Sequence, residues 1–364
     1  MKNQLLGLGT AVPAESVNQS DALRMTTDLV CRDDTQKRFL RVLFSHSGVE
    51  RRHTVLPWQI GYEWKQSPSG GDEQSGPSTG ERMQMYEAHA SELAIAAARD
   101  AVAEQQIDPR LITHLVTVSC TGFSSPGIPE YLSDALGLGS TVQRVQVGFM
   151  GCHGAINGLR VARALTAEDP RAVVLLVAVE LCSIHYRMHW DAEGVKGNAL
   201  FADGAAAVLL GACEQPDTGG WTLQGTGSCA IPNSRDEMSW IIGDHGFEMK
   251  LTSRVPVLIE QHLRDWMAAW LDRFGYSIND IAGWAIHPGG PRILEAAEKA
   301  LGLSRELCQY SHDVLRDYGN MSSPTVLFLL NRIRQDVQGP VVLLGFGPGL
   351  TAEAALFEHT GESR

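Results

Sequence analysis

The stretch from Gln143 to Arg163 reads Gln-Arg-Val-Gln-Val-Gly-Phe-Met-Gly-Cys-His-Gly-Ala-Ile-Asn-Gly-Leu-Arg-Val-Ala-Arg. A strand-like run ends at Val147, glycines stand on both sides of Cys152, and a pattern with helical spacing follows. A strand, a tight glycine turn and a helix form the geometry that exposes a nucleophile. The free N–H groups and the dipole of a helix N-terminus favour a thiolate, so the stretch predicts a nucleophilic Cys152 with a lowered pKa. The structural alternative is a buried cysteine in a glycine-rich turn.

Outward from this stretch, strand patterns alternate with helix patterns along the chain. Short apolar runs with β-branched residues predict strands, and apolar residues spaced by three and four predict helices. This alternation is typical of an α/β fold in which helices cover a mixed or parallel sheet. The predicted strands are 5–8, 114–119, 142–147, 173–179 and 341–346, and the predicted helices are 85–104, 154–165, 255–274 and 293–301.

Two segments rich in glycine, proline and serine interrupt the pattern. Trp58 to Glu81 predicts a loop, either a disordered segment or a lid. Glu214 to Gly220 predicts a domain boundary, which divides the chain into residues 1–214 and 215–364. Each part has its own strand and helix signals, as expected of two similar halves.

Composition narrows the class of protein. The chain has 364 residues, 44 % hydrophobic and 20 % charged, which fits a globular protein. Its 30 basic and 42 acidic residues give a net charge of −12, which argues against broad nucleic-acid binding. The apolar run from Ala172 to Val179 is too short for a membrane span, and the first residues lack a signal-peptide pattern. We therefore expect a cytoplasmic protein without a membrane span.

The seven cysteines do not suggest a metal site or disulfides. Their number is odd and no Cys-x-x-Cys pair occurs, so we expect no metal ligands and no redox cofactor. Most of these cysteines should be small buried hydrophobic residues. One of them, Cys152, is free to serve as a nucleophile.

Two further segments supply partners for a thiolate. Trp284-Ala-Ile-His287-Pro-Gly-Gly ends an apolar run with a histidine, and Tyr318-Gly-Asn320-Met-Ser-Ser puts an asparagine before an amphipathic stretch, at a helix N-cap position. Polar groups at strand ends and helix starts are common in the active sites of α/β enzymes, and a thiolate needs a partner that stabilises its charge. Each residue alone also fits a structural role, as a turn histidine or as a cap.

Taken together, these motifs resemble the chalcone and stilbene synthase family, the type III polyketide synthases of the thiolase superfamily. The resemblance covers nearly the whole chain. Cys152 followed by His-Pro-Gly-Gly, Gly-Asn-Met-Ser-Ser and Gly-Phe-Gly-Pro-Gly in this order forms a highly specific set, whereas each glycine motif alone is weak. The segments that carry the resemblance are Gly7-Leu-Gly-Thr-Ala-Val-Pro, Cys120-Thr-Gly, the Cys152 stretch, Ala199-Leu-Phe-Ala-Asp-Gly, His287-Pro-Gly-Gly-Pro, Gly319-Asn-Met-Ser-Ser and Gly345-Phe-Gly-Pro-Gly.

The resemblance implies a thiolase-like homodimer with a five-layered αβαβα fold made of two similar stacked halves. Cys152 would carry the acyl group, and His287 and Asn320 would complete a catalytic triad. No cofactor is implied, because the substrates are acyl-CoA and malonyl-CoA thioesters that are already activated. Hydrogen bonds donated by His287 and Asn320 to one thioester oxygen would stabilise the enolate that forms when a malonyl thioester loses CO₂.

The resemblance also implies residues around an acyl cavity. Phe201 matches a gatekeeper phenylalanine, with an ordinary core aromatic as the alternative. Glu180 follows an apolar run and is either part of a structural network or an organiser of cavity water. His153, which follows the nucleophile, is expected at a helix start facing solvent or a dimer contact. The implied substrate-binding residues are Cys120, Glu180, Cys182, His185, Phe201, Met249 and Ser322.

The implied entrance for coenzyme A departs from the family pattern. Basic residues occur from Lys37 to Arg52, but His46 and Val42 stand where plant members have Lys and Arg. Arg41 and Arg292 are the candidate contacts for the phosphates of coenzyme A. The departure leaves an acyl carrier protein as an alternative donor.

The leading hypothesis is a type III polyketide synthase that releases a cyclised pyrone or resorcinol. One alternative is a stand-alone ketosynthase, similar to ketoacyl synthase III, that joins acyl chains held by a carrier protein. Another is a catalytically silent partner subunit, which the complete set of Cys152, His287 and Asn320 argues against.

Overall fold

The structure is a computed structural model that describes residues 2–66, 76–213 and 220–360 of the chain. Within these ranges, nine strands form one mixed sheet in the order β11-β12-β13-β8-β1-β7-β6-β4-β5. Parallel pairing joins β4 to β5 and β6, and β11 to β12, whereas the other neighbours are antiparallel. The strands are β1 (Lys2–Ala11), β4 (His114–Ser119), β5 (Gln143–Gly148), β6 (Val173–Leu181), β7 (Asp203–Cys213), β8 (Gly220–Ala230), β11 (Gly283–Ile286), β12 (Pro340–Gly347) and β13 (Thr351–Thr360).

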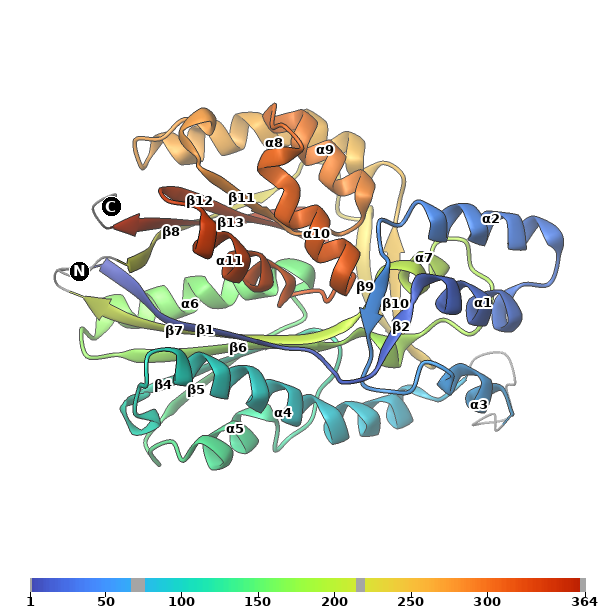
Figure 1. Ribbon diagram of the computed structural model, residues 1–364, viewed down its shortest axis with the longest axis horizontal. Coiled ribbons are helices and arrows are strands. Elements are labelled where there is room, and N and C mark those ends of the chain that lie inside the picture. The colour runs from blue at the N-terminus through green and yellow to red at the C-terminus, as the bar shows by residue number, and fades with distance from the viewer. Residues whose placement is uncertain (1, 67–75, 214–219, 361–364) are drawn as a thin grey trace.

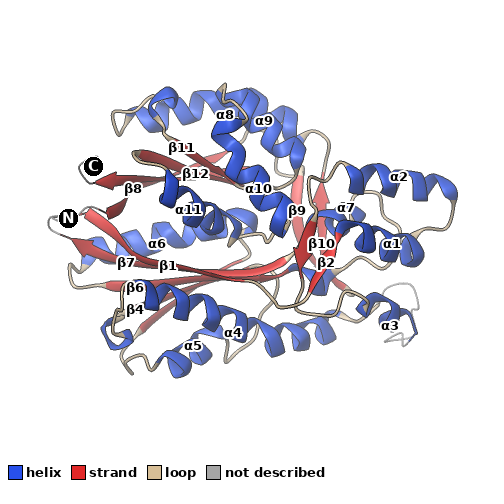
Figure 2. Cartoon of the chain, viewed as in Figure 1, coloured by secondary structure: helices blue, strands red, loops and turns tan. Residues whose placement is uncertain are grey.

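This sheet has two halves, and helices lie on both sides of each half. The pairs Asn3–Leu223 and Gln4–Thr222 join β1 of one half to β8 of the other. Two helices lie between the halves and others cover the outer faces, which gives the five layers αβαβα (Figures 1 and 2). The inner helices are α6 (Gly154–Glu168) and α11 (Thr325–Asp336); the outer ones are α4 (Thr79–Glu104), α5 (Ile128–Leu136), α8 (Val255–Asp272), α9 (Pro291–Leu301) and α10 (Gln309–Tyr318).

Strand β6 shows why the layers stack. Val174, Leu176 and Ala178 belong to the core around α6 and α11. Their neighbours Leu175 and Val177 belong to the outer core under α4. Because successive side chains of a strand point to opposite faces, a strand buried on both faces must be apolar throughout.

Smaller elements gather at one end of the two half-sheets (Figure 1). Two antiparallel strand pairs and four helices there lie beside the turn that carries Cys152, and they contribute to the walls of the cavities described below. They are β2 (Ser16–Asn18) with β3 (Arg51–His53), β9 (Met238–Gly243) with β10 (Gly246–Leu251), α1 (Gln19–Val30), α2 (Asp34–Ser45), α3 (Ile60–Gln66) and α7 (Val195–Leu200).

The structure confirms all of the predicted strands and helices, with shifted ends. The helix predicted over 85–104 begins six residues earlier, because Ser78 and Glu81 form a capping box at the start of α4. The prediction of a continuous loop over 58–81 is therefore wrong: α3 and the first turn of α4 lie inside it, and residues 67–75 are outside the described residues. The predicted boundary also falls largely outside the described residues, between the end of β7 at Cys213 and the start of β8 at Gly220. Among the described residues, no helix has the length and apolar character needed to span a membrane.

Candidate active site

Cys152 lies in the turn between β5 and α6. A short 3-10 turn, Gly151–His153, follows the strand, and α6 begins at Gly154. Gly151 has φ +75°, and a Cβ atom there would collide with the ring of Pro348. The glycine next to the nucleophile is therefore required both by the backbone conformation and by close packing.

The surroundings of Cys152 hold its sulfur in the thiol form. Burial raises the pKa of Cys152 to about 11, and the nearby Glu180 carboxylate adds to the effect. Hydrogen bonds from Ser322 and Asn320 to the sulfur act in the opposite direction, but they are outweighed. The sequence-based expectation of a lowered pKa for Cys152 is therefore wrong. Desolvation exceeds the influence of the helix N-terminus, which begins only at Gly154.

His287 follows the end of β11, and its backbone N–H donates to the carbonyl of Leu344 at 2.7 Å. Both ring nitrogens are buried, and neither has a hydrogen-bond partner in the part of the chain that the structure describes. Burial lowers the pKa of His287 to about 3, with a smaller contribution from His153. A neutral imidazole with two unpartnered nitrogens, next to Cys152 and Asn320 in the lining of one cavity, is available to a bound ligand.

Asn320 lines the same cavity, and its backbone forms an isolated β-bridge with Phe201. Its N–H donates to Leu200 O at 2.8 Å, and its carbonyl accepts from Ala202 N at 2.9 Å. Its side-chain Oδ1 accepts from Ser322 N at 2.8 Å, which leaves the amide N–H₂ to donate toward Cys152. The predicted N-cap role is wrong, because α11 begins at Thr325 and Asn320 is instead fixed by its bridge to Phe201.

The geometry joins three segments that are far apart in the sequence, and the family assignment agrees with it. The family model described as "Chalcone and stilbene synthases, N-terminal domain" matches residues 1–214. The model of the C-terminal domain of the same family matches residues 223–360. The chain belongs to the chalcone and stilbene synthase family. It is 32% identical over 361 residues to the alpha-pyrone synthesis polyketide synthase-like Pks18 of Mycobacterium tuberculosis, covering 97% of this chain and 90% of the relative. The chain is also 32% identical over 379 residues to type III polyketide synthase A of Arabidopsis thaliana. This match covers 100% of this chain and 94% of the relative.

Solved structures agree with this assignment. PKS-I of the brown alga Ectocarpus siliculosus superposes with a TM-score of 0.88 at 27% identity, covering 99% of this chain and 98% of that chain. The C-terminal type III polyketide synthase domain of Steely1 from Dictyostelium superposes with a TM-score of 0.89 at 26% identity. The match covers 99% of this chain and 100% of that chain. The enzyme is a type III polyketide synthase, that is, a condensing acyltransferase with a thiolase-like fold.

The cavity beside Cys152 in this synthase collects most of the predicted substrate-binding residues. It contains about 450 Å³ of space between atoms. Met238, Trp240 and Pro348 also form its wall, although they were not among the predicted residues. No sequence signal marks Trp240, because the run Met238-Ser-Trp-Ile-Ile-Gly243 does not alternate between apolar and polar residues. The predicted residues in this lining are Cys120, Cys152, Cys182, Phe201, Met249 and Ser322.

Glu180 of the synthase is fully buried and lies outside this lining. Its Oε2 accepts from Cys120 N at 2.9 Å and from Thr121 Oγ1 at 2.8 Å. Its Oε1 accepts from Ser323 Oγ at 2.6 Å. Both carboxylate oxygens are thus used by the protein, which favours the structural-network interpretation over an organiser of cavity water.

His153 is buried, at 2 % exposure, contrary to the expected solvent or dimer position. The ring packs against Gly345 and Gly347 at the end of β12, where side chains would leave no room for it. Its Nδ1 pairs with Asn157 Oδ1 at 2.7 Å. Asn157 in turn donates to Glu353 at 3.2 Å, so the histidine belongs to a buried polar network.

The predicted phosphate contacts of the synthase lie on two helices beside a polar groove. Arg41 on α2 and Arg292 on α9 are exposed. The groove itself holds about 950 Å³ between atoms, and neither arginine is part of its lining. Two arginines that were not predicted, Arg305 and Arg316, do line it.

Proposed function

We propose that the synthase loads an acyl group from an acyl-CoA thioester onto Cys152, extends it with malonyl-CoA and releases a cyclised pyrone or resorcinol. One observation carries this proposal: Cys152, Asn320 and the His287 ring, whose nitrogens have no partner among the described residues, line one cavity. Apolar residues form most of the remaining wall, which favours an acyl chain over a polar substrate.

In the loading step, His287 accepts the proton of the Cys152 thiol as the sulfur attacks the thioester carbonyl. A new C–S bond forms, the bond to the coenzyme A sulfur breaks, and His287 returns the proton to the departing thiolate. Burial lowers the pKa of His287 to about 3, so its ring is neutral and carries a nitrogen lone pair that can take the proton.

In the extension step, the carbonyl oxygen of the malonyl thioester accepts hydrogen bonds from His287 and Asn320. The C–C bond to the carboxylate breaks, CO₂ leaves, and the electron pair moves into an enolate. The enolate carbon attacks the acyl carbonyl on Cys152, whose sulfur leaves. Removing one such donor costs about 3–4 kcal/mol of transition-state stabilisation.

The groove next to α2 and α9 is the proposed approach for coenzyme A, with Arg41 and Arg292 as phosphate contacts at its edge. An acyl carrier protein is the second candidate donor. The exposed Phe39 and Val42 on α2, next to Arg41, favour this candidate because they offer an apolar and basic surface to an acidic protein.

We also propose a cytoplasmic homodimer built from two halves, 1–214 and 215–364. The exposed apolar side chains on and beside the edge strand β5 support the dimer: Val145, Phe149, Met150 and Phe123. The free cysteines Cys31, Cys120, Cys152, Cys182, Cys229 and Cys308 support a reducing compartment.

Mass spectrometry of products tests the proposal. Purified enzyme is incubated with malonyl-CoA and acyl-CoAs, next to Cys152→Ala and a control, Cys229→Ala, which changes a cysteine far from the cavity. We expect polyketides from the wild type and the control and none from Cys152→Ala. Full product from Cys152→Ala would overturn the proposal, whereas an acyl adduct on Cys152 without product from CoA substrates would favour carrier-protein donors.

A further inference from the structure

Three cavities meet where helix α7 ends beside strand β10. One of about 450 Å³ lies beside Cys152, one of about 420 Å³ is lined by His287 and Asn320, and one of about 810 Å³ extends toward α1 and α3. Phe201, which follows α7, and Met249 of β10 line all three. The relative position of α7 and β10 therefore affects how far the three spaces are separated.

Phe201 and Met249 both lie close to Gly197 of α7. A Cβ atom on this glycine would stand 3.1 Å from Cδ2 of Phe201 and 3.9 Å from Cε of Met249. The end of α7 is also tied to Asn320, whose N–H donates to the carbonyl of Leu200 at 2.8 Å. A shift of β10 relative to α7 would thus separate the two apolar side chains right beside the candidate catalytic groups.

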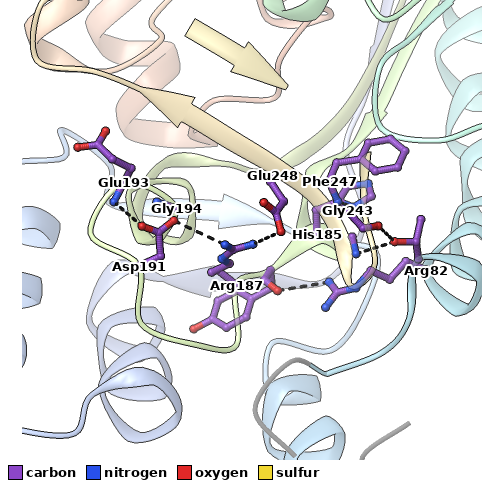
Figure 3. Close-up of polar contacts among 12 residues, drawn as sticks. Arg82, His185, Arg187, Asp191, Glu193, Gly194, Gly243, Phe247 and Glu248 are labelled. Carbon is purple, nitrogen blue, oxygen red and sulfur yellow. Dashed lines mark hydrogen bonds and ion pairs between the residues drawn. The ribbon is translucent and has the colours of Figure 1, made fainter. Parts of the chain in front are cut away.

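Arg187 joins α7 to β10. Its backbone N–H donates to Asn198 Oδ1 at 3.0 Å, and its carbonyl accepts from Asn198 Nδ2 at 2.9 Å, so one side chain of α7 holds this residue by both backbone groups. Its guanidinium reaches β10, where it donates to Glu248 Oε1 at 3.0 Å, and it lies 3.6 Å from Asp191 Oδ2. Figure 3 shows the guanidinium between these two carboxylates.

The loop before α7 is built around this guanidinium. Asp191 accepts from the backbone N–H groups of Glu193, at 3.3 Å, and Gly194, at 3.0 Å. A Cβ atom on Gly194 would stand 2.7 Å from Asp191 Oδ2 and 3.2 Å from Arg187 Nε. The glycine therefore gives the carboxylate and the guanidinium the room to lie this close together.

Buried Arg82 fixes the segment that leads into Arg187. It donates to the carbonyls of Ile184 and Tyr186 (Figure 3). Burial lowers the pKa of Arg82 to about 10, and the nearby charge of Arg187 adds to the effect. Two guanidinium groups this close repel each other, so the carboxylate of Glu248 is attracted to a site with an excess of positive charge.

The ion pair acts on the middle of β10. Glu248 and Met249 are successive residues of a strand, so their side chains point to opposite faces: the half-exposed carboxylate meets Arg187, and the thioether lines the cavities. Other contacts hold the strand nearer its ends, at the N–H of Phe247 and the carbonyl of Leu251. The position of Met249 therefore depends directly on the contact between Glu248 and Arg187.

We propose that Arg187 is a positioning residue: through Glu248 it holds β10 against α7 and keeps Phe201 and Met249 together around the reacting groups. The inference rests on the function proposed above. There, the malonyl thioester loses CO₂, and the enolate carbon either attacks the acyl carbonyl on Cys152 or takes a proton from water, which leaves acetyl-CoA. Two apolar side chains that confine the reactants and exclude water favour the first outcome.

The experiment counts both outcomes. The enzyme receives ¹³C-labelled malonyl-CoA and the acyl-CoA that gives the most product, and mass spectrometry measures labelled acetyl-CoA and new C–C bonds in the products. Arg187→Met and Glu248→Gln should each raise the ratio of acetyl-CoA to new C–C bonds by about threefold or more, because a small misplacement is enough to uncouple the two steps. A merely structural loss lowers the amount of active enzyme and leaves this ratio unchanged.

Further variants show whether the two residues act as one pair. Arg187→Met combined with Glu248→Gln should have no larger effect than Arg187→Met alone, because both changes remove the same contact. Arg187→Lys, which keeps a cation, should stay closer to the wild-type ratio. Lys299→Met, which removes the ion pair with Glu260 between α8 and α9, is the matched control and should leave the ratio unchanged.

Two results would overturn the inference. One is a wild-type ratio in Arg187→Met and Glu248→Gln proteins that are folded by circular dichroism; the other is a double variant whose effect is the product of the single effects, which would mean that the residues act separately. Glu248→Gln, at a half-exposed position, carries the test if Arg187→Met does not fold. Failure of the proposed function is separate, because it would appear as no polyketide from the wild type or as product from Cys152→Ala.

Discussion

At the scale of single residues, Cys152 and His287, which exchange a proton in the proposed loading step, are both neutral. Burial raises the pKa of Cys152 to about 11 and lowers the pKa of His287 to about 3. Desolvation disfavours the charged form of each group, so a thiolate–imidazolium pair is unfavourable. Cys152 is therefore held as a thiol, which reacts more slowly than a thiolate.

This protonation state predicts how Cys152 reacts with iodoacetamide in the free enzyme. Only the thiolate reacts, and a raised pKa means that its fraction keeps increasing with pH. The alkylation rate of Cys152 should therefore rise about tenfold per pH unit from pH 7 to pH 10, measured on its peptide by mass spectrometry. Free glutathione, assayed in parallel, should level off earlier. A plateau for Cys152 below pH 8 would instead indicate a preformed ion pair with His287.

At the scale of elements, Asp203 joins the start of β7 to the segments that follow β3 and β6. Its carboxylate accepts from Val55 N at 2.8 Å, after β3, and from Ser183 N at 2.7 Å, after β6. It is fully buried and lies near the buried Arg52, which donates to the carbonyls of Asn198 and Phe201. One carboxylate thus balances a buried cation and satisfies two backbone donors.

Replacing this carboxylate should destabilise the fold. Asp203→Ala leaves the N–H groups of Val55 and Ser183 and the Ser183 hydroxyl without their acceptor, so we expect the free energy of unfolding to fall by about 3–5 kcal/mol. Asp203→Asn, which keeps one acceptor, should lose less. Urea denaturation followed by circular dichroism measures both, with exposed Asp272→Ala as a control that should stay within about 0.5 kcal/mol of the wild type. A loss for Asp203→Ala as small as that of the control would show that the three elements are held together by other contacts.

The elements also show how far the sequence predicts this molecule. Strands such as β6 are predictable because burial on both faces demands an unbroken apolar run. Phe201 and Cys182 were predictable from the family resemblance. The place of Trp240 in the cavity wall was not predictable, because it depends on a hairpin that brings this residue against Cys120, far away in the sequence. The raised pKa of Cys152 was missed for a similar reason: a motif gives the turn, but burial comes from all the segments packed around it.

At the scale of the whole molecule, the sheet ends at β5 with an unprotected edge. Val145 on this strand is 38 % exposed, and Phe123 in the neighbouring loop is 60 % exposed. An edge strand has unpaired backbone N–H and C=O groups that can pair with another chain, and globular proteins usually protect such edges. The cysteine turn follows β5 directly, so a second copy on this edge would also cover the outer side of the turn.

A charge on the edge should therefore separate the proposed dimer. We expect Val145→Lys to convert the protein from dimer to monomer in sedimentation-velocity experiments, because pairing would bury an uncompensated ammonium group. Val257→Lys, a change at a 51 % exposed valine on α8 in the other half, should leave the oligomeric state unchanged. If the edge also supports the Cys152 turn, the Val145→Lys monomer should lose activity while retaining its circular dichroism spectrum. A Val145→Lys protein that remains dimeric would mean that the copies associate through another surface.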